Sequence, residues 1–423
     1  MNNHTIKEIY ARQILDSRGN PTIEAQILLH SGITASAAVP SGASTGQYEA
    51  VELRDEADIY CGKSVFKAIA NIKEIINEEL KDYDIFNQSS IDHKLIDLDG
   101  TENKSNLGAN ATLAVSLAAA RTAAVASKMP LYRYLGGAAA MTMPVPMLNV
   151  LNGGAHANNN VEIQEFMIVP VGAPTFTKAM EMSMTVYHAL GHILKESGLG
   201  TTVGDEGGFA PNLENDEQAL KLLIRSIERS GLIPGKDIAI ALDAAASEWK
   251  STEDYLQPKS KKRLTTAELI QYFDDLINKY PIISLEDPLG DDDFAGFAQI
   301  RKQTGIQIVG DDLFVTNSSR LKKGISKKSG NAILIKPNQI GTLSETLETI
   351  RLAKSHGYKT IISHRSGETA DPFIADLAVA VNAGQIKTGA PARSERVCKY
   401  NRLMGIEQVL GIHSYYPGSA AFL

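Results

Sequence analysis

The segments IAIALD (238–243) and IISLE (282–286) each run through apolar, β-branched residues and stop at a carboxylate. Four later apolar segments also end at a charged or polar residue: IQIVGD (306–311), AILIK (332–336), TIISH (360–364) and QIK (385–387). Their final residues, Asp243, Glu286, Asp311, Lys336, His364 and Lys387, are spaced by 43, 25, 25, 28 and 23 residues. The shorter intervals fit one strand and one helix, so the pattern predicts a parallel sheet closed into a (β/α) barrel.

The first third of the chain has a different pattern, which predicts a smaller α+β domain over residues 1–137, ahead of a barrel domain over residues 138–423. Residues 6–15 and 22–30 are rich in β-branched residues and flank the turn-rich DSRGNP, so they predict a hairpin. A third strand is expected at residues 33–39.

Two helices are expected after these strands, at residues 65–80 and 109–127. The second is alanine-rich, but polar residues such as Asn110 and Arg121 interrupt it. It therefore predicts a buried helix and not a membrane span. Gly136 and Gly137 mark a helix stop and the expected domain boundary.

Composition excludes several classes of function. The chain has 423 residues, with 42 Lys and Arg against 49 Asp and Glu, a net charge of −7, which argues against nucleic acid as the substrate. Its two cysteines, Cys61 and Cys398, form no disulfide framework and no cysteine-based metal site. The first ten residues are polar, unlike a secretory signal, so a cytoplasmic protein is expected.

Asp243, Glu286 and Asp311 end three successive predicted strands. Three converging carboxylates repel one another unless a cation lies between them, and an all-oxygen site favours Mg²⁺ or Mn²⁺. Two alternatives stay open for these acids: ordinary salt bridges, and turn or helix-capping positions. Lysine is a poor helix cap, so Lys336 and Lys387 weaken the capping alternative.

Lys336 and Lys387 are expected to face the same cavity. Nearby divalent cations and a second lysine disfavour the charged form of a lysine, so one of the two is a candidate general base near pH 7. A metal ion held by carboxylates beside such a base suits the removal of a proton next to a carboxylate group of the substrate. Composition does not tell which lysine is the base, and ordinary ion pairing remains the alternative for each.

Three loops carry further candidates. The glycine-rich GDEGGFAP (204–211) is suited to hold Glu206 against a ligand, although an acidic turn is the simpler alternative. Arg365 and Ser366, at the end of a predicted strand, are a combination that binds phosphate. His156 lies in the loop GGAHA (153–157), where a surface histidine without a role is the default.

These segments, in this order, resemble the enolase family, in its bacterial type. The matching motifs are SGASTG at Ser41, GGAHANN around His156, QEF (164–166), GDEGGFAP, LDAAASE (242–248), SLEDPL (284–289), GDDLFVTN (310–317), IKPNQIGTL (335–343), SHRSGET (363–369) and KTGAPARSER (387–396). The resemblance runs from about Ile6 to the C-terminus. It implies a C-terminal (β/α)8-type barrel of the enolase kind after a smaller α+β domain, with the active site at the C-terminal ends of the strands.

The resemblance also implies an activity: reversible, Mg²⁺-dependent dehydration of 2-phospho-D-glycerate to phosphoenolpyruvate. By resemblance, Lys336 removes the C2 proton, Glu206 protonates the departing C3 hydroxyl with Glu165 beside it, and His156 and His364 lie in the pocket. The implied substrate contacts are Gln164, Arg365, Ser366, Lys387 and Ser41. The implied ligands of the first Mg²⁺ are Asp243, Glu286 and Asp311, and Ser41 with the substrate phosphate holds a second Mg²⁺.

The resemblance implies a homo-oligomer, as a dimer or an octamer, that acts on a small molecule. Two alternatives stay open: another superfamily activity, such as a racemase or cycloisomerase, and a secreted or cell-surface fraction with an adhesion or scaffold role, including RNA-processing assemblies. Arg365, Ser366, Ser41 and Glu206 together favour enolase. Ala370, Pro337, Asn158 and Trp249 depart from the commoner family pattern, and none carries a proposed catalytic atom.

Overall fold

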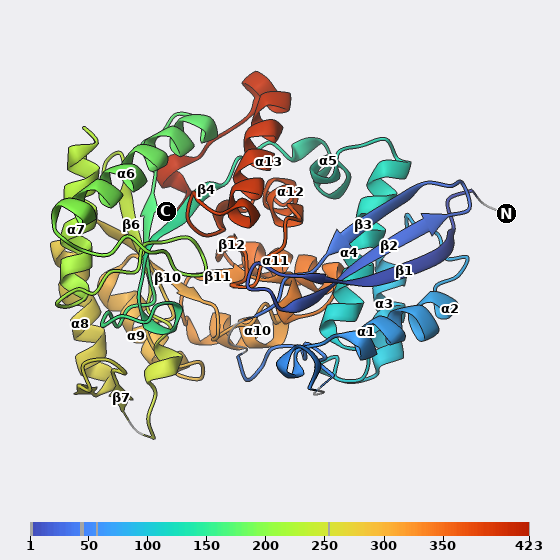
Figure 1. The fold of residues 1–423 in the computed structure, drawn as a ribbon, viewed down its shortest axis with the longest axis horizontal. Coiled ribbons are helices and arrows are strands. Elements are labelled where there is room, and N and C mark those ends of the chain that lie inside the picture. Colours follow the sequence, from blue (N-terminus) through green and yellow to red (C-terminus); the bar gives the residue numbers. More distant parts are fainter. Residues whose placement is uncertain (1–2, 43–45, 56–57, 253, 423) are drawn as a thin grey trace.

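The computed structural model describes residues 3–42, 46–55, 58–252 and 254–422. Figure 1 shows a barrel with its helices on the left and a smaller part, built on a three-stranded sheet, on the right. The chain passes from the smaller part to the barrel between α5 (Leu131–Gly136) and β4 (Val145–Asn152). The predicted α/β architecture, a barrel preceded by a smaller α+β unit, is therefore confirmed.

The small sheet consists of β1 (Ile6–Leu15), β2 (Pro21–Leu29) and β3 (Thr34–Ala38), in that order and antiparallel. The predicted hairpin and third strand are confirmed, and Leu15 pairs with Pro21 across the turn. Asp16 closes that turn because its carboxylate accepts hydrogen bonds from the backbone N–H groups of Arg18 and Asn20.

The helices of this part are α1 (Phe66–Ala70), a π-helical segment (Asn71–Ile76), α2 (Asn77–Glu79), α3 (Gln88–Asp99), α4 (Ala109–Ala126) and α5. Some of them pack on the sheet, chiefly α4 and the segment from α1 to α2, while α3 and α5 pack on α4. The helix expected at 65–80 is thus present with a π-helical middle. By length and composition α4 is apolar enough to cross a membrane, but 83% of that stretch is buried inside the protein. This agrees with the predicted buried helix.

Eight strands close the barrel in the order β10-β11-β12-β13-β4-β5-β6-β9. They are β4, β5 (Glu165–Val169), β6 (Ala239–Asp243), β9 (Ile282–Glu286), β10 (Gln307–Gly310), β11 (Ala332–Ile335), β12 (Lys359–Ser363) and β13 (Gly384–Lys387). All six predicted strands are present. Inward side chains such as Met147, Val309 and Leu334 fill the barrel interior, so it is a packed core and not a pore.

One barrel strand departs from the predicted parallel sheet. β5 runs antiparallel to both β4 and β6, while the other neighbouring strands are parallel. β4 and β5 are joined directly by the short segment 153–164, which contains no helix long enough to carry the chain back across the barrel. A direct connection of this kind joins antiparallel strands. As a result, Glu165 at the start of β5 lies level with Asp243 at the end of β6.

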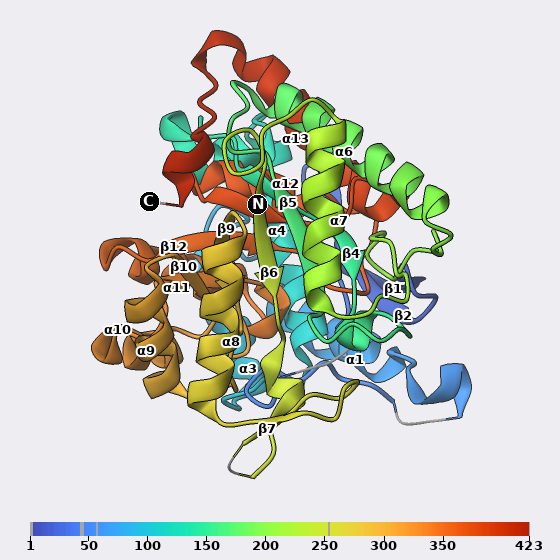
Figure 2. The ribbon, with the colours of Figure 1, turned by 90° about the vertical axis from the view of Figure 1, so that its left-hand side faces the viewer.

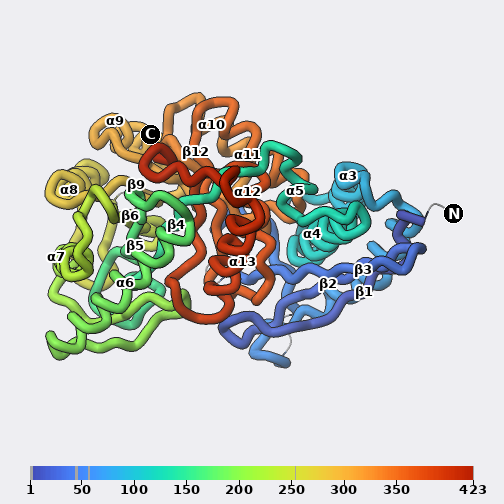
Figure 3. Tube along the Cα trace, turned by 90° about the horizontal axis from the view of Figure 1, so that it is seen from above, coloured from blue at the N-terminus to red at the C-terminus, as the bar shows by residue number. Residues whose placement is uncertain are grey.

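Helices surround the barrel, as Figures 2 and 3 show. They are α6 (Phe176–Glu196), α7 (Asp216–Arg229), α8 (Thr266–Lys279), α9 (Phe294–Thr304), α10 (Ser318–Lys327), α11 (Leu343–Ser355), α12 (Phe373–Ala380) and α13 (Ser394–Leu410). A small hairpin, β7 (Tyr255–Leu256) with β8 (Arg263–Leu264), occupies the long interval after β6. Side-chain N-caps come from Thr175, Asn215, Thr265, Asp293, Asn317 and Thr342, and not from the residues that end the strands.

The smaller part contacts the rim of the barrel through backbone and side-chain bonds. Ser41 N–H donates to the carbonyl of Gly367 at 2.7 Å, and Ala50 N–H donates to that of Gln339 at 2.9 Å. Farther out, Arg121 of α4 forms two hydrogen bonds with the carboxylate of Asp371. These contacts hold the segment around residues 46–52 against the ends of the barrel strands.

Candidate active site

The residues that end the barrel strands meet around one cavity. Asp243, Glu286 and Lys387 are the last residues of β6, β9 and β13, and Asp311, Lys336 and His364 directly follow β10, β11 and β12. All of these side chains except Glu286 line the cavity, and Glu286 lies behind Lys387, from which it accepts a hydrogen bond. The other lining residues are His156, Gln164, Glu165, Glu206, Arg365, Ser366, Glu49, Glu248, Asp287 and Asp312. Residues up to 338 positions apart in the sequence thus share one surface.

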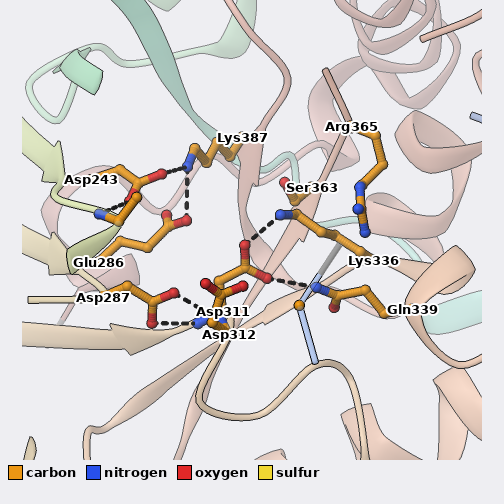
Figure 4. A network of polar contacts seen from close by, with 12 residues as sticks. Asp243, Glu286, Asp287, Asp311, Asp312, Lys336, Gln339, Ser363, Arg365 and Lys387 are labelled. Carbon is orange, nitrogen blue, oxygen red and sulfur yellow. Dashed lines mark hydrogen bonds and ion pairs between the residues drawn. The ribbon is translucent and has the colours of Figure 1, made fainter. Parts of the chain in front are cut away.

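Buried carboxylates surround Lys387 on one side of the cavity (Figure 4). Its ammonium nitrogen lies 2.9 Å from Asp243 Oδ2, 2.8 Å from Glu286 Oε1 and 3.3 Å from Glu165 Oε2. Burial and the neighbouring charge of Asp243 raise the pKa of Glu286 well above its usual range. Glu286 Oε2 has no hydrogen-bond partner among the described residues. These acids hold more negative charge than one lysine compensates.

Asp311 lies between Lys336 and Gln339. Its Oδ2 pairs with the Lys336 ammonium, and its Oδ1 accepts a hydrogen bond of 2.8 Å from the Gln339 amide (Figure 4). Thr316 orients that amide, because its hydroxyl donates to Gln339 Oε1 at 2.7 Å. Val315 and Thr316 have φ angles of 44° and 54°, which is an unfavourable backbone conformation for β-branched residues. The local strain places the Thr316 hydroxyl in this network.

Both lysines pair with acids in the structure. Burial opposes the charged form of Lys336, but the carboxylates around it, Asp311 first and then Glu286, raise the lysine pKa in spite of burial. The pKa of Lys387 is raised well above its usual range by Asp243, Glu165 and Glu286, again against burial. The expectation of a neutral lysine applies to acids neutralised by bound cations, and it stays a prediction for the metal-loaded site.

Glu165, which also contacts Lys387, forms a coupled pair of buried carboxylates with Glu206. Burial and the charge of Glu206 raise the pKa of Glu165 well above its usual range. The pKa of Glu206 is well below its usual range in spite of burial, because His364 and His156 lie beside it. Asn149 also donates to Glu206 Oε2 at 2.9 Å. The two carboxylates titrate as a coupled pair, in which the protonated form is favoured at Glu165 and the charged form at Glu206.

Two histidines approach this pair. His156 Nδ1 lies 3.6 Å from Glu165 Oε1 and 3.8 Å from Glu206 Oε1, and His364 Nε2 lies 3.5 Å from Glu206 Oε2. Burial and the charge of Arg396 lower the pKa of His364 to about 4, although Glu206 opposes this shift. His364 is therefore neutral at physiological pH. His156 belongs to the connection between β4 and β5, so the antiparallel hairpin brings it over the rim.

Arg365 enters the cavity from the loop after β12. Its guanidinium donates to Glu49 Oε2 at 2.7 Å, and both side chains are buried. Glu49 belongs to the smaller part of the chain, so this ion pair joins the two parts inside the cavity. Against the effect of burial, Glu49 raises the pKa of Arg365. Ser366 follows Arg365 on the same wall.

Ser41 is not among the residues that line this cavity. It lies in a neighbouring cavity with Arg18, Glu52 and Arg54, and Glu49 lies on the wall between the two cavities. Its hydroxyl donates to Asp16 Oδ2, and its backbone forms two hydrogen bonds with Gly367. The rest of the motif that begins at Ser41, residues 43–45, lies outside the described part of the chain.

The cavity holds a volume of about 60 Å³, which is enough for a few water molecules. Pockets for small molecules usually measure roughly 300–1,000 Å³. Two ion pairs occupy its walls, because Lys387 lies among the carboxylates and Glu49 pairs with Arg365.

Sequence reasoning missed several residues of the site. Asp287 accepts hydrogen bonds from the backbone N–H groups of Asp311, at 3.0 Å, and Asp312, at 2.8 Å. Burial and Asp311 raise the pKa of Asp312 to about 7. Glu49, Gln339 and Arg396 were also missed. All but Glu49 lie inside the quoted motifs, so the motifs pointed to them, but neither spacing nor residue type distinguished them from their neighbours.

The chemistry available here combines acids, bases and an anion-binding cation. A buried lysine and a pair of proton-sharing carboxylates face one space, so a proton can be removed at one wall and supplied at the other. Clustered carboxylates on the floor suit a divalent cation with oxygen ligands. Arginine and serine at the rim suit a phosphate or a carboxylate. The arrangement fits an elimination on a small, anionic substrate.

Comparison with known families agrees with the fold and with this chemistry. Residues 6–135 match the family model of the enolase N-terminal domain. Residues 140–423 match the family model of the enolase C-terminal TIM barrel domain. Together the two matches span nearly all of the chain, and the second alone spans more than half of it. The chain therefore belongs to the enolase family.

Proposed function

We propose that this protein is a phosphopyruvate hydratase, which reversibly dehydrates 2-phospho-D-glycerate to phosphoenolpyruvate and water, as a bacterial-type enzyme of glycolysis and gluconeogenesis. The observation that carries the proposal is the placement of Lys336 and Glu206 on one cavity together with Arg365, Ser366 and the carboxylate cluster. A racemase or cycloisomerase has no need for the arginine and serine at the phosphate position. Family membership supports the lyase class.

The donor set fits magnesium. Asp243, Glu286 and Asp311 are buried carboxylates on adjacent strands, and Glu286 Oε2 has no hydrogen-bond partner in the described residues. In the proposal these three residues hold one Mg²⁺, and Ser41 with the substrate phosphate holds a second. Bound Mg²⁺ stabilises the dianion that forms when the proton beside the substrate carboxylate is removed, and it neutralises the acids that keep the lysines charged.

The side chains of the protein have separate tasks in this proposal. Lys336 takes the C2 proton, and Lys387 binds the substrate carboxylate with Gln164. Arg365 and Ser366 bind the phosphate after Glu49 has left the guanidinium. Glu206 gives a proton to the departing C3 hydroxyl. Since the protonated form of the coupled pair is favoured at Glu165, we infer that Glu165 supplies the proton to Glu206 or positions it there. His156 and His364 complete the wall around the leaving group.

The test is the rise in ultraviolet absorbance as 2-phosphoglycerate becomes phosphoenolpyruvate, with Mg²⁺ and then with excess chelator. A rise that the chelator abolishes supports the proposal, and Glu206→Gln should remove it. Exposed Glu196, which pairs with Arg229 on the surface, offers a matched control as Glu196→Gln, with unchanged turnover expected. No rise in the folded, metal-loaded protein overturns the assignment.

The remaining expectations are proposals of the same kind. We propose a cytoplasmic homo-oligomer, a dimer or an octamer, with a surface or scaffold role as a secondary function. Sedimentation analysis measures the oligomeric state. Detection on washed cells, with a cytoplasmic marker absent, tests the surface role, and absence from that fraction contradicts it.

A further inference from the structure

Arg396 is a fully buried arginine on α13 whose polar contacts lie almost entirely on one loop. One of its terminal nitrogens lies 2.6 Å from His364 Nδ1 and 2.6 Å from the carbonyl of Arg365. The other lies 2.6 Å from the carbonyl of Ser366 and 3.4 Å from that of Asp205. One guanidinium therefore contacts three consecutive residues of the loop after β12.

The space around Arg396 is shaped to fit it. Gly389 has a φ angle of +82°, and a Cβ atom there would lie 2.9 Å from Arg396 Cδ and 3.0 Å from the carbonyl oxygen of Glu206. Among the described residues, the one carboxylate within ion-pair distance of the guanidinium is that of Glu395, 3.5 Å from Nε. A buried cation without a close, hydrogen-bonded counter-charge is costly. Its carbonyl and ring contacts must compensate for that cost, which indicates a specific role.

The contact with His364 determines the position of a proton. A guanidinium only donates hydrogen bonds, so the Nδ1 atom that faces it must be the unprotonated nitrogen of the ring. The hydrogen of the neutral imidazole is then on Nε2, the atom that lies 3.5 Å from Glu206 Oε2. The contact of Arg396 with Nδ1 thus determines that Nε2 carries the hydrogen that faces Glu206.

We propose that Arg396 is a positioning residue that fixes His364 as the Nε2–H tautomer, directed at Glu206, and that holds His364, Arg365 and Ser366 in one rigid loop. It touches neither substrate nor reacting atoms. The kinetic part of this inference rests on the proposed function, but the tautomer does not. Loss of Arg396 frees the ring to protonate at Nδ1 and lets the loop that carries Arg365 relax.

Nitrogen-15 NMR of protein labelled at the histidine rings tests the tautomer directly, with His364→Asn assigning the signal among the nine histidines. In the wild type we expect a protonated Nε2 and an unprotonated Nδ1. In Arg396→Ala we expect a mixture of tautomers or the Nδ1–H form. An Nδ1–H ring in the wild type overturns the proposal, and this measurement needs no variant at Arg396 to fold.

Rescue by millimolar guanidinium, below denaturing concentration, separates positioning from a general structural role. In Arg396→Ala we expect kcat/KM to fall about tenfold or more, as for loss of a hydrogen bond from a charged donor, and free guanidinium to restore both turnover and tautomer. Arg402→Ala is the matched control, because Arg402 lies on the same helix and pairs with Asp376 away from the loop. It should show neither the tautomer change nor rescue.

The outcomes distinguish the two proposals. If Arg396→Ala folds, by circular dichroism, and its His364 keeps the wild-type tautomer, the positioning role is wrong. If Arg396→Lys retains the wild-type tautomer and full turnover, the forked geometry of the guanidinium has no role, and the proposal is also wrong. If the wild type has no hydratase activity but Arg396→Ala changes the tautomer of His364, the proposed function fails and the positioning role stands.

Discussion

Glu49 Oε2 lies 2.7 Å from the guanidinium of Arg365, inside the cavity and away from solvent. The carboxylate comes from the smaller part of the chain and the arginine from the barrel. Arg365 is the arginine proposed to bind the substrate phosphate, and the Glu49 carboxylate is the anion that pairs with it in this structure. The ion pair therefore joins the proposed phosphate site to the contact between the two parts of the molecule.

Glu49→Gln should lower the free energy of unfolding by about 3 kcal/mol, because it leaves the buried Arg365 charge without its counter-charge. Inorganic phosphate should stabilise this variant more than the wild type, since no carboxylate competes for the arginine. Thermal melting with and without phosphate measures both effects. Glu24→Gln breaks the exposed pair with Arg12 and should cost less than about 1 kcal/mol. Equal phosphate responses would contradict the role of Glu49.

Lys336→Ala should reduce kcat by at least about 10²–10⁴-fold while the protein stays folded, because loss of a general base removes a contribution of that size. Stopped assays of phosphoenolpyruvate formation measure the fall in kcat, and circular dichroism checks that the variant is folded. Lys302→Ala, at an exposed position on α9, is the control and should keep full turnover. A Lys336→Ala enzyme with normal turnover would falsify the assignment of the base.

Magnesium should stabilise the wild type by about 2.7 kcal/mol at a concentration 100 times its dissociation constant. Asp311→Asn should reduce this stabilisation, because it removes one of three proposed ligand charges. Calorimetric titration and thermal melting in Mg²⁺ measure the change. Asp275→Asn, whose carboxylate accepts a hydrogen bond from Gln271 on the surface of α8, should bind Mg²⁺ as the wild type does. Equal affinity in Asp311→Asn would remove that residue from the ligand set.

The lowered pKa of His364 should make the free energy of unfolding depend on pH in metal-free buffer. Burial lowers its pKa from 6.5 to about 4, so between these values the unfolded chain binds a proton that the folded protein does not. The free energy of unfolding should therefore fall by about 3 kcal/mol as the pH falls through this window. Above pH 6.5 both states are neutral and the effect is absent.

Denaturant titrations of the wild type and His364→Asn across this range isolate the histidine. The comparison is needed because Asp312, with its pKa raised to about 7, changes stability in the opposite direction: its folded-state proton is lost as the pH rises. The free energy of unfolding of the wild type, minus that of the variant, should fall by about 3 kcal/mol as the pH falls through this window. A constant difference would show that His364 is not held neutral.

Most of the fold could be predicted from the sequence, because the hairpin pattern of the first third and the strand-then-helix repeat of the rest are both local. The hairpin at Ile6–Leu29 and the six strand ends follow from β-branched runs and their terminators. The direction of β5 could not be predicted, since it depends on the length of the connection after β4 and not on any residue within the strand. The π-helical segment at Asn71–Ile76 likewise leaves no mark in the apolar spacing.

The candidate site divides in the same way. Strand ends such as Asp243 and Lys387 could be located because the barrel topology brings them to one rim. Glu49 and Arg396 could not, because each acts through a tertiary contact with the loop after β12, more than 30 residues away along the chain. The pairing of Lys336 with Asp311 could not be predicted for a related reason: it depends on which neighbour is closest in the folded protein.

The reversed strand β5 has a consequence for how this barrel can change. Asn152 pairs with Glu165, so the segment that carries His156 leaves and re-enters the barrel at adjacent points. Its second half is tied to helix α7, because the N–H groups of Glu162 and Ile163 donate to the carboxylate of Asp216. Doubling the length of a flexible loop adds only about 0.6 kcal/mol of closure entropy. Insertions around His156, ahead of these two residues, would therefore alter what covers the rim of the cavity while every strand keeps its register.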